Sequence, residues 1–414
     1  MSSPRRDRRL LAAVVFAVLL AQVLLYPGVP DLVAAVGATT TLDASMWFLA
    51  AEFAAFVAFA GVWGALSDVT GRRVPYIVAG AVGGSAGYFA LALLPAALSL
   101  SFAEVLAVRV LQGATTIGAF SLSMTMLMDL EGGHGRNMGA AGIAIGLGTA
   151  VGAPLGGRLY GFGPLVPLYV AGGLLLCAAA LALLVGRHAP PADSATAESA
   201  DDSTGATPGR IAEALSVLAD RPTLGVPYVF GFIDRFTAGF FALVGTVYFR
   251  QEFGLDAATT GILLGLFFVP FALLQYPFGV LSDRIGRTKP IVAGSAVYGL
   301  AVVGVGLAPT VATAGAAMVG VGVVGALMAP ATMALVTDLA TDADRGTAMA
   351  GFNVFGSLGF LAGIVVGGTV ADEVGFLAAF LVAGALETAI ALVSIPAFLK
   401  FDLGERGEGA AFGR

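Results

Sequence analysis

The stretch Gly64-Ala-Leu-Ser-Asp68-Val-Thr-Gly71-Arg72-Arg73 forms a very short loop between two apolar runs, each long enough to span a membrane. A second copy, Gly279-Val-Leu-Ser-Asp283-Arg284-Ile-Gly286-Arg287-Thr-Lys289, has the same setting later in the chain. Each copy places an acid, a glycine and a basic cluster between two apolar runs. The pattern therefore predicts two copies of one membrane unit.

The composition is that of an integral membrane protein. Of the 414 residues, 58% are hydrophobic and 12% are charged, whereas soluble domains carry about 25% charged residues. We predict an all-α integral membrane protein with twelve transmembrane helices in two pseudo-symmetric six-helix bundles. The expected spans are about 10–26, 46–66, 75–97, 103–128, 138–157, 165–186, 223–248, 258–281, 290–308, 312–337, 347–370 and 375–399.

These spans divide the chain into four segments. We expect an amino-terminal six-helix half at 1–186, a carboxy-terminal six-helix half at 223–400 and a polar tail at 401–414. The segment between the halves, 187–222, is acidic and rich in small polar residues, which predicts a flexible linker. The basic start also suits a signal peptide, but many spans follow, so we expect a retained first helix. A loop is predicted at 27–45.

The distribution of positive charge supports this count of spans. With twelve spans, seventeen basic residues lie on the side of the two termini, and only Arg158 and Arg250 lie on the other. Loops that carry the excess of Lys and Arg stay in the cytoplasm. We therefore expect a multi-pass protein of the cell membrane with both termini, the linker and the tail in the cytoplasm.

Further motifs repeat between the halves. Asp129 precedes Arg136 by seven residues, and Asp338 precedes Arg345 by the same interval. Glycine-rich spans end in a Gly-Gly pair in both halves, at 156–157 and 367–368. The equivalent loops lie on one side, so the repeats are parallel. Parallel repeats are typical of secondary transporters that hold substrate between the repeats, near the bilayer midplane.

With these motifs, nearly the whole chain resembles the major facilitator superfamily, and within it the twelve-helix drug–proton antiporters. The family pattern is G-x-L-x-D-(R/K)-x-G-R-(R/K). The second copy matches at Gly279, Leu281, Asp283, Arg284, Gly286 and Arg287. The first matches at Gly64, Leu66, Asp68, Gly71, Arg72 and Arg73, but has Val69 where a base is usual.

The loop motif has a physical reason besides the resemblance. Asp68 lies at the carboxyl end of its helix, where the helix dipole disfavours an anion, so it needs a partner. Gly71 permits a tight reversal with positive φ. The resemblance implies that this cluster latches the cytoplasmic side shut, with the acid facing the start of the eleventh helix. A simple positive anchor is the alternative, although an anchor needs neither the acid nor the glycine. We assign to this gate Gly64, Asp68, Gly71, Arg72, Arg73, Asp129, Arg136, Gly279, Asp283, Arg284, Gly286, Arg287, Asp338 and Arg345.

Arg109 lies inside the fourth span, in Arg109-Val-Leu-Gln112-Gly113. A charge at the bilayer centre costs roughly 2.5–3.5 kcal/mol on insertion scales, so Arg109 must face the protein interior. The stretch resembles the family's R-x-x-Q-G motif, whose arginine the resemblance implicates in proton coupling. A structural arginine that bonds backbone carbonyls between helices remains the alternative.

A glycine ladder marks the fifth span, and its counterpart marks the eleventh. Small residues at intervals of four let helices approach closely, and a proline inside a helix kinks it. The fifth span resembles the antiporter signature G-x-x-x-G-P-x-x-G-G, with the proline one place late. The alternative is ordinary close packing. The packing and kink residues are Gly148, Gly152, Pro154, Gly156, Gly157, Gly363 and Gly367.

Three acids lie well inside spans, and such acids are functional candidates. Desolvation favours the neutral form of a carboxyl group and can bring proton exchange into the working pH range. Glu52 has no evident partner in the sequence and is our preferred proton carrier. Asp234 adjoins Arg235, so the two are either coupling residues or a structural ion pair. For Glu387, the alternative to a functional role is that it simply faces the interior of the helix bundle. The coupling candidates are Glu52, Arg109, Asp234 and Arg235.

The leading function is proton-coupled export of a lipophilic or amphipathic small molecule by alternating access, as in a multidrug efflux antiporter. Few charges lie in the spans, which favours an apolar cavity, and no G-x-x-x-x-G-K-[ST] loop for ATP occurs. A sugar or metabolite symporter or uniporter, a non-transporting sensor, and sodium in place of the proton remain alternatives. We expect a monomer in the lipid bilayer that is not an enzyme. We also expect no nucleic acid partner, no cofactor and no metal. The cavity candidates are Gln22, Gln112, Phe236, Gln275 and Asn353.

Overall fold

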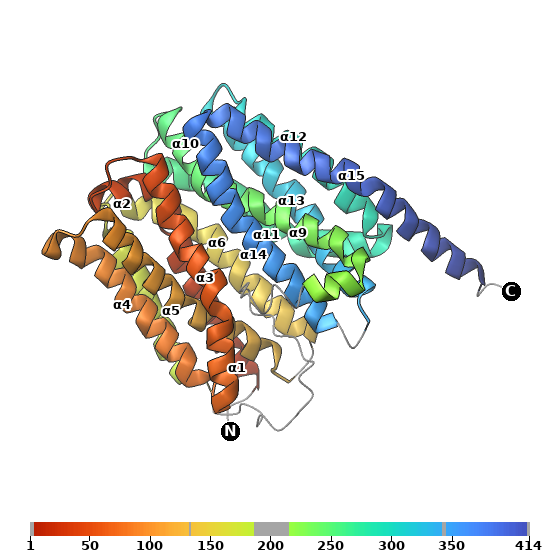
Figure 1. Cartoon of the computed structure of the whole chain (residues 1–414), viewed down its shortest axis with the longest axis horizontal. Helices are drawn as coiled ribbons and strands as arrows, with labels where there is room; N and C mark the ends of the chain where they lie inside the picture. Colours follow the sequence, from red (N-terminus) through yellow and green to blue (C-terminus); the bar gives the residue numbers. More distant parts are fainter. Residues whose placement is uncertain (1–3, 132–133, 186–214, 342–344, 412–414) are drawn as a thin grey trace.

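The computed structural model describes residues 4–131, 134–185, 215–341 and 345–411, and in these ranges it is helical without a strand (Figure 1). Within the described residues, 12 helices are long and apolar enough to cross a membrane. The predicted fold class, an all-α membrane protein with twelve spans, is confirmed.

The amino-terminal half contains six spanning helices, the first of which is interrupted. Its elements are α1 (Pro4–Val23), η1 (Tyr26–Gly28), α2 (Val29–Ala35), α3 (Leu42–Thr70), α4 (Val74–Leu98), α5 (Phe102–Met128), α6 (His134–Tyr160) and α7 (Val166–Leu183).

The carboxy-terminal half has the same plan. Its elements are η2 (Pro222–Leu224), α9 (Gly225–Phe240), η3 (Phe241–Gly245), α10 (Thr246–Gln251), α11 (Ala257–Ile285), α12 (Thr288–Gly306), α13 (Val311–Leu339), α14 (Arg345–Glu373) and α15 (Phe376–Ala411). The segment η3 is one turn of π-helix that joins α9 to α10 in a single span.

Two predicted boundaries differ from the structure. The loop predicted at 27–45 is largely helical, because η1 and α2 prolong the first span and α3 already begins at Leu42. Pro27 and Pro30 fall in the first turns of η1 and α2, where a missing N–H costs nothing. At the other end, α15 continues to Ala411, through most of the predicted tail. Most of the predicted linker lies outside the described residues.

The glycine ladders bring the same pair of helices together in each half. A Cβ at Gly148 would lie 2.9 Å from Leu19 Cβ, and one at Gly152 would lie 2.8 Å from Val23 Cβ, so α6 packs closely on α1. In the other half, Gly363 lies against the backbone of Phe236, and Gly367 faces Phe240, so α14 packs on α9. The predicted repeat is thus visible in the packing.

The second glycine of each Gly-Gly pair faces the opposite half. Gly157 of α6 lies against the backbone of Ala257, the first residue of α11, and a Cβ at Gly368 of α14 would lie 2.7 Å from Met46 Sδ of α3. Asp256 caps α11 at this point by accepting a hydrogen bond from Thr259 N–H at 2.8 Å. The hydrogen bonds from Thr259 lower the pKa of the Asp256 carboxyl group.

We call the side of the bundle with loops 64–73 and 279–289 the motif side, and the other end the far side. The contacts that join the halves include Phe53 stacked on Phe360 at 4.1 Å and, nearer the far side, Thr369 bonded to Met46. Figure 1 shows α3 and α14 close together toward the far side and diverging toward the motif side.

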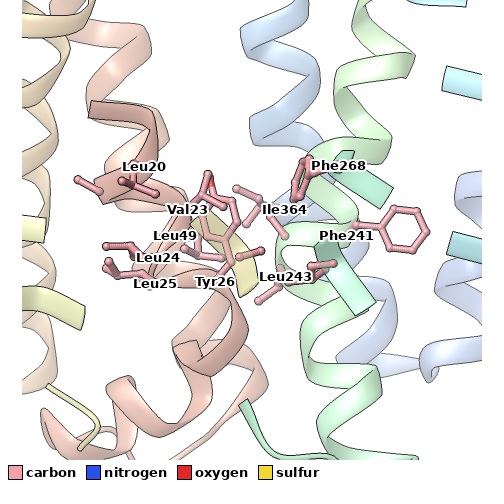
Figure 2. Close-up of a cluster of buried hydrophobic side chains, with 14 of the residues drawn as sticks. Leu20, Val23, Leu24, Leu25, Tyr26, Leu49, Phe241, Leu243, Phe268 and Ile364 are labelled. Carbon is pink, nitrogen blue, oxygen red and sulfur yellow. The ribbon is translucent and has the colours of Figure 1, made fainter. Parts of the chain in front are cut away.

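Buried apolar side chains fill the joint between the halves. Figure 2 shows Leu24, Leu25 and Tyr26 from the junction of α1 and η1 beside Leu243 of the π-turn and Ile364 of α14. All five are at most 2% exposed. The halves are therefore sealed by a continuous apolar core at this level.

Candidate functional site

A buried polar network lies in the amino-terminal half, between α3, α4 and α5. Arg109 Nη2 donates to Glu52 Oε2 at 2.7 Å, and both side chains are 0% exposed. Arg109 Nη1 donates to Gln112 Oε1 at 2.7 Å, and Gln112 in turn donates to Thr116. The Tyr88 hydroxyl donates to the other oxygen of Glu52 at 3.4 Å. The charges of this network neutralise each other.

The sequence accounts for the closeness of these helices. Gly113 follows Gln112 directly, and a Cβ at Gly113 would lie 2.9 Å from the carbonyl oxygen of Glu52. A larger residue would push α3 away from α5 and lengthen the ion pair. The guanidinium group of Arg109 also lies 4.4 Å from the ring centre of Phe48, a cation–π distance. The glycine of the R-x-x-Q-G stretch therefore has a structural purpose here.

Glu52 thus has a partner that the sequence did not reveal. Its apparent isolation reflected sequence distance only, because Arg109 comes from another helix. Both readings of Arg109, a coupling residue and a structural bridge, are compatible with its contacts, since it bonds the Glu52 carboxylate and also donates to the Phe48 carbonyl at 3.4 Å.

A second buried carboxyl group lies in the carboxy-terminal half. Glu387 of α15 is 0% exposed. Ser295 of α12 donates to its Oε2 at 3.0 Å, and Thr237 of α9 donates to its Oε1 at 3.2 Å. Glu387 therefore joins three helices through hydroxyl groups and not through a base.

Asp234 and Arg235 do not form an ion pair with each other in the described structure. Neighbouring residues on a helix point in different directions. Asp234 is half-buried and Arg235 is exposed, with its side-chain stem against Gly356 of α14. The interpretation of this dipeptide as a structural ion pair is therefore wrong.

The gate motifs bond within their own halves. Arg73 pairs with Asp129 at the end of α5, and the equivalent Arg287 pairs with Asp338 at the end of α13 at 3.0 Å. Arg287 also pairs with Asp283 and donates to Ser282. These matched clamps hold each motif loop to the helix end beside it.

Gly71 caps α3 with the predicted positive φ, 63°, and the equivalent Gly286 ends α11 with φ of 88°. The side chain of Asp68 is exposed and has no hydrogen bond or ion pair in the described part of the chain. Arg72, Arg136 and Arg284 are also exposed. The predicted latch partner of Asp68 is thus not engaged in this conformation.

A pair that the sequence analysis missed joins the halves on the far side. Arg250 Nη2 at the end of α10 donates to Asp31 Oδ1 of α2 at 2.5 Å. Gln251 donates to Thr41 at 3.3 Å beside it. Arg250 is one of only two bases expected on this side. This scarcity was the one sequence feature that could have indicated a specific partner for Arg250.

The cavity candidates differ in their surroundings. Gln112 is engaged in the Arg109 network. Gln22 is 4% exposed, and its Nε2 has no hydrogen-bond partner in the described structure. Phe236 is 2% exposed and packs in the α9–α14 contact. Gln275 and Asn353 are half-buried on α11 and α14.

Relatives of known sequence are membrane transporters. The chain is 35% identical over 148 residues to the inner membrane transport protein YajR of Escherichia coli, which is 36% of this chain and 32% of that protein. It is 28% identical over 162 residues to YfkF of Bacillus subtilis, described as an uncharacterized MFS-type transporter, covering 39% of this chain and 38% of that protein. The matched stretches thus span about a third of these relatives.

Solved structures share the fold over nearly the full chain. A bacterial homolog of the human lysosomal transporter Spinster, in an inward-facing and unoccupied conformation, superposes with a TM-score of 0.71 at 16% identity and 98% coverage of both chains. The nucleoside transporter NupG superposes with a TM-score of 0.72 at 13% identity, covering 95% of this chain and 100% of that one. The family model described as Major Facilitator Superfamily matches residues 11–249 and 228–410. The chain therefore belongs to the Major Facilitator Superfamily.

Proposed function

We propose that the chain is a secondary active transporter of the cell membrane that works by alternating access and exports lipophilic or amphipathic small molecules in exchange for protons. Both termini and the motif side would face the cytoplasm, as the charge distribution suggests. Transport as such fits the family. The structural neighbours include a nucleoside transporter and a homolog of a lysosomal transporter, so the fold alone does not choose the substrate.

The observation that carries alternating access is the unequal joining of the halves. On the far side, the Arg250–Asp31 ion pair and the Gly157 and Gly368 contacts cross between the halves. On the motif side, the Arg73–Asp129 and Arg287–Asp338 clamps stay within one half each. Such unequal joining would suit a transporter that is closed on the far side and can open on the motif side.

The opposite state would exchange these contacts. Asp68 has no partner here, at the carboxyl end of α3 where the dipole disfavours its charge. The amino-terminal end of α14 carries the opposite dipole, and pairing there would stabilise Asp68 when the motif side closes. The Arg250–Asp31 pair would have to break in the same step.

An apolar substrate is favoured by the aromatic side chains at the joint. Phe53 contacts both Phe56 of α3, with ring centres 5.6 Å apart, and Phe360 of α14. The fully buried charges of Glu52 and Arg109 are already paired with each other. The buried side-chain groups without a hydrogen-bond partner in the described residues are few, namely Gln22 Nε2 and the Ser121 and Ser123 hydroxyl groups, which favours a lipophilic compound over a highly hydroxylated sugar.

Proton coupling would use intramembrane carboxyl groups. The candidates from the sequence are Asp234, which has no ion pair in the described structure, and Glu52, which is bound to Arg109. Proton binding at Glu52 would weaken its bond to Arg109, so this pair would couple protonation to the packing of α3 against α5.

A pH-gradient collapse assay tests the proposal. Purified protein in liposomes with a transmembrane pH gradient and a pH-sensitive dye is exposed in turn to tetraphenylphosphonium, ethidium, neutral drugs, sugars and organic acids. Dissipation by lipophilic compounds, absent from empty liposomes, is the expected result. If only a radiolabelled sugar or acid equilibrates and nothing collapses the gradient, the export proposal fails and a uniporter is indicated. Replacing the proton gradient by a sodium gradient tests the coupling ion.

A further inference from the structure

Glu387 lies at the crossing of α12 and α15, where the two backbones approach most closely through glycine. Gly299 of α12 lies directly against the Gly384 carbonyl and the Thr388 side chain of α15. Neither Gly299 nor Gly384 has room for a Cβ. One turn from Gly299, Ser295 reaches the carboxyl group of Glu387. The crossing therefore fixes the distance between the hydroxyl and the carboxyl group.

The titratable groups that face Glu387 carry no positive charge at neutral pH. Asp234 of α9 and Tyr298 of α12 interact with it electrostatically. Between Arg345 and Asp372, α14 contains no titratable residue. Lys289 lies in the first turn of α12, and Lys400 lies beyond the spanning part of α15, which ends at Pro396. In the described structure, no base lies within ion-pair distance of Glu387.

An ionised carboxylate here would be a buried charge without a counter-charge. Such a charge is costly unless it is paired or neutralised. A bound proton removes the charge without moving any helix. Ser and Thr hydroxyl groups can both donate and accept hydrogen bonds, so Ser295 and Thr237 can bond to the carboxyl group in either protonation state.

We propose that Glu387, held by Ser295 and Thr237 at the α12–α15 crossing, is a proton-binding site of the carboxy-terminal half. Its use in transport rests on the function proposed above, but the binding of the proton does not. Thr237 lies on α9, the helix that carries Asp234 and packs on α14. Loss of the proton would therefore alter the bonding between α9 and the α12–α15 pair, the helices of one half.

Infrared difference spectroscopy of the purified full chain, titrated over pH in potassium buffer, tests the site without any substrate. The expected result is a protonated-carboxyl C=O band that is lost in Glu387→Gln and kept in Glu52→Gln. Ser295→Ala should shift the band to higher frequency, because the carboxyl group loses a hydrogen bond. Gel filtration and thermal unfolding establish that each variant is folded.

Two outcomes overturn the proposal. One is a protonated-carboxyl band of equal intensity in wild type and in folded Glu387→Gln, or the lack of such a band in both proteins. The other is a carboxylate signal of Glu387 that responds to sodium and not to pH, which would make the site a sodium site. If the band behaves as expected but no compound collapses the pH gradient, the proton site stands and the transport proposal fails.

Discussion

Glu52 and Glu387 are both fully buried carboxyl groups inside spans, one in each half, yet their surroundings are opposite. Glu52 is paired with Arg109 at 2.7 Å, and Gln112, Thr116 and Tyr88 extend its network. Glu387 has two hydroxyl partners and, among the described residues, no basic partner. The difference separates a carboxyl group whose charge is already balanced from one whose charge is balanced only by a proton.

The comparison assigns different consequences to loss of each group. Removing one member of the Glu52–Arg109 pair leaves an uncompensated buried charge. Neutralising Glu387, by a proton or by substitution with Gln, leaves no buried charge, because its partners Ser295 and Thr237 are uncharged hydroxyl groups. The amino-terminal network should therefore matter most for stability, and the carboxy-terminal site for the binding of protons.

The largest effect is expected from Arg109→Leu. Breaking a buried ion pair by removing one partner costs about 3–5 kcal/mol, because the other charge stays buried. Unfolding in detergent micelles, followed by tryptophan fluorescence against denaturant, measures the loss. The double variant Arg109→Leu with Glu52→Gln should regain part of the stability. A single variant as stable as the wild type would show that Glu52 does not depend on Arg109.

The second effect concerns the glycine crossing that positions Glu387. Gly299→Ala should destabilise the chain by about 1–3 kcal/mol, the range for overpacking a tight contact, because α12 must move off Gly384. Gly304→Ala on the same helix is the matched control, since nothing lies within 4 Å of its Cβ position. Thermal unfolding compares the two, and equal stabilities would remove the argument that this crossing is tight.

A smaller effect on stability is expected from Glu387→Gln. Gln keeps two hydrogen-bonding groups at nearly the same positions, and side-chain hydrogen bonds between membrane helices average about 0.6 kcal/mol. Unfolding of Glu387→Gln beside Glu52→Gln measures the difference directly. Glu52→Gln leaves the buried charge of Arg109 without its partner. The comparison is contradicted if Glu387→Gln is as destabilising as Glu52→Gln.

The smallest loss of stability is expected from Arg250→Gln on the far side. Its pair with Asp31 is partly exposed, with side chains 18% and 39% accessible, and exposed ion pairs contribute about 0.2–1 kcal/mol. The consequence should instead be a wider far side, measured as a longer spin-label distance between the halves. Arg158→Gln, an exposed base on the same side, is the control. Unchanged distances in Arg250→Gln would show that this pair does not hold the halves together.

The sequence predicted the elements whose signal is local. Apolar runs of spanning length, the glycine turn at Gly71 and the paired glycine ladders could all be recognised from residue types alone. The ladders even indicated close packing, although only the structure shows that Gly156 faces the same half and Gly157 the other.

Contacts between distant helices could not be predicted in the same way. Arg109 and Glu52 are on different helices, and no local spacing pairs them. The same holds for Ser295 with Glu387 and for Arg250 with Asp31. The predicted loop at 27–45 was wrong for a different reason, since η1 and α2 continue the first span there and Pro27 and Pro30 occupy first turns of helices.

The most direct test of the account separates coupling from transport in one preparation. Proteoliposomes of wild type and Glu387→Gln are loaded with tetraphenylphosphonium, and two rates are measured, exchange of labelled probe at equal pH and accumulation driven by a pH gradient. The account predicts that Glu387→Gln keeps the exchange and loses the accumulation. Accumulation in Glu387→Gln equal to that of the wild type would contradict it.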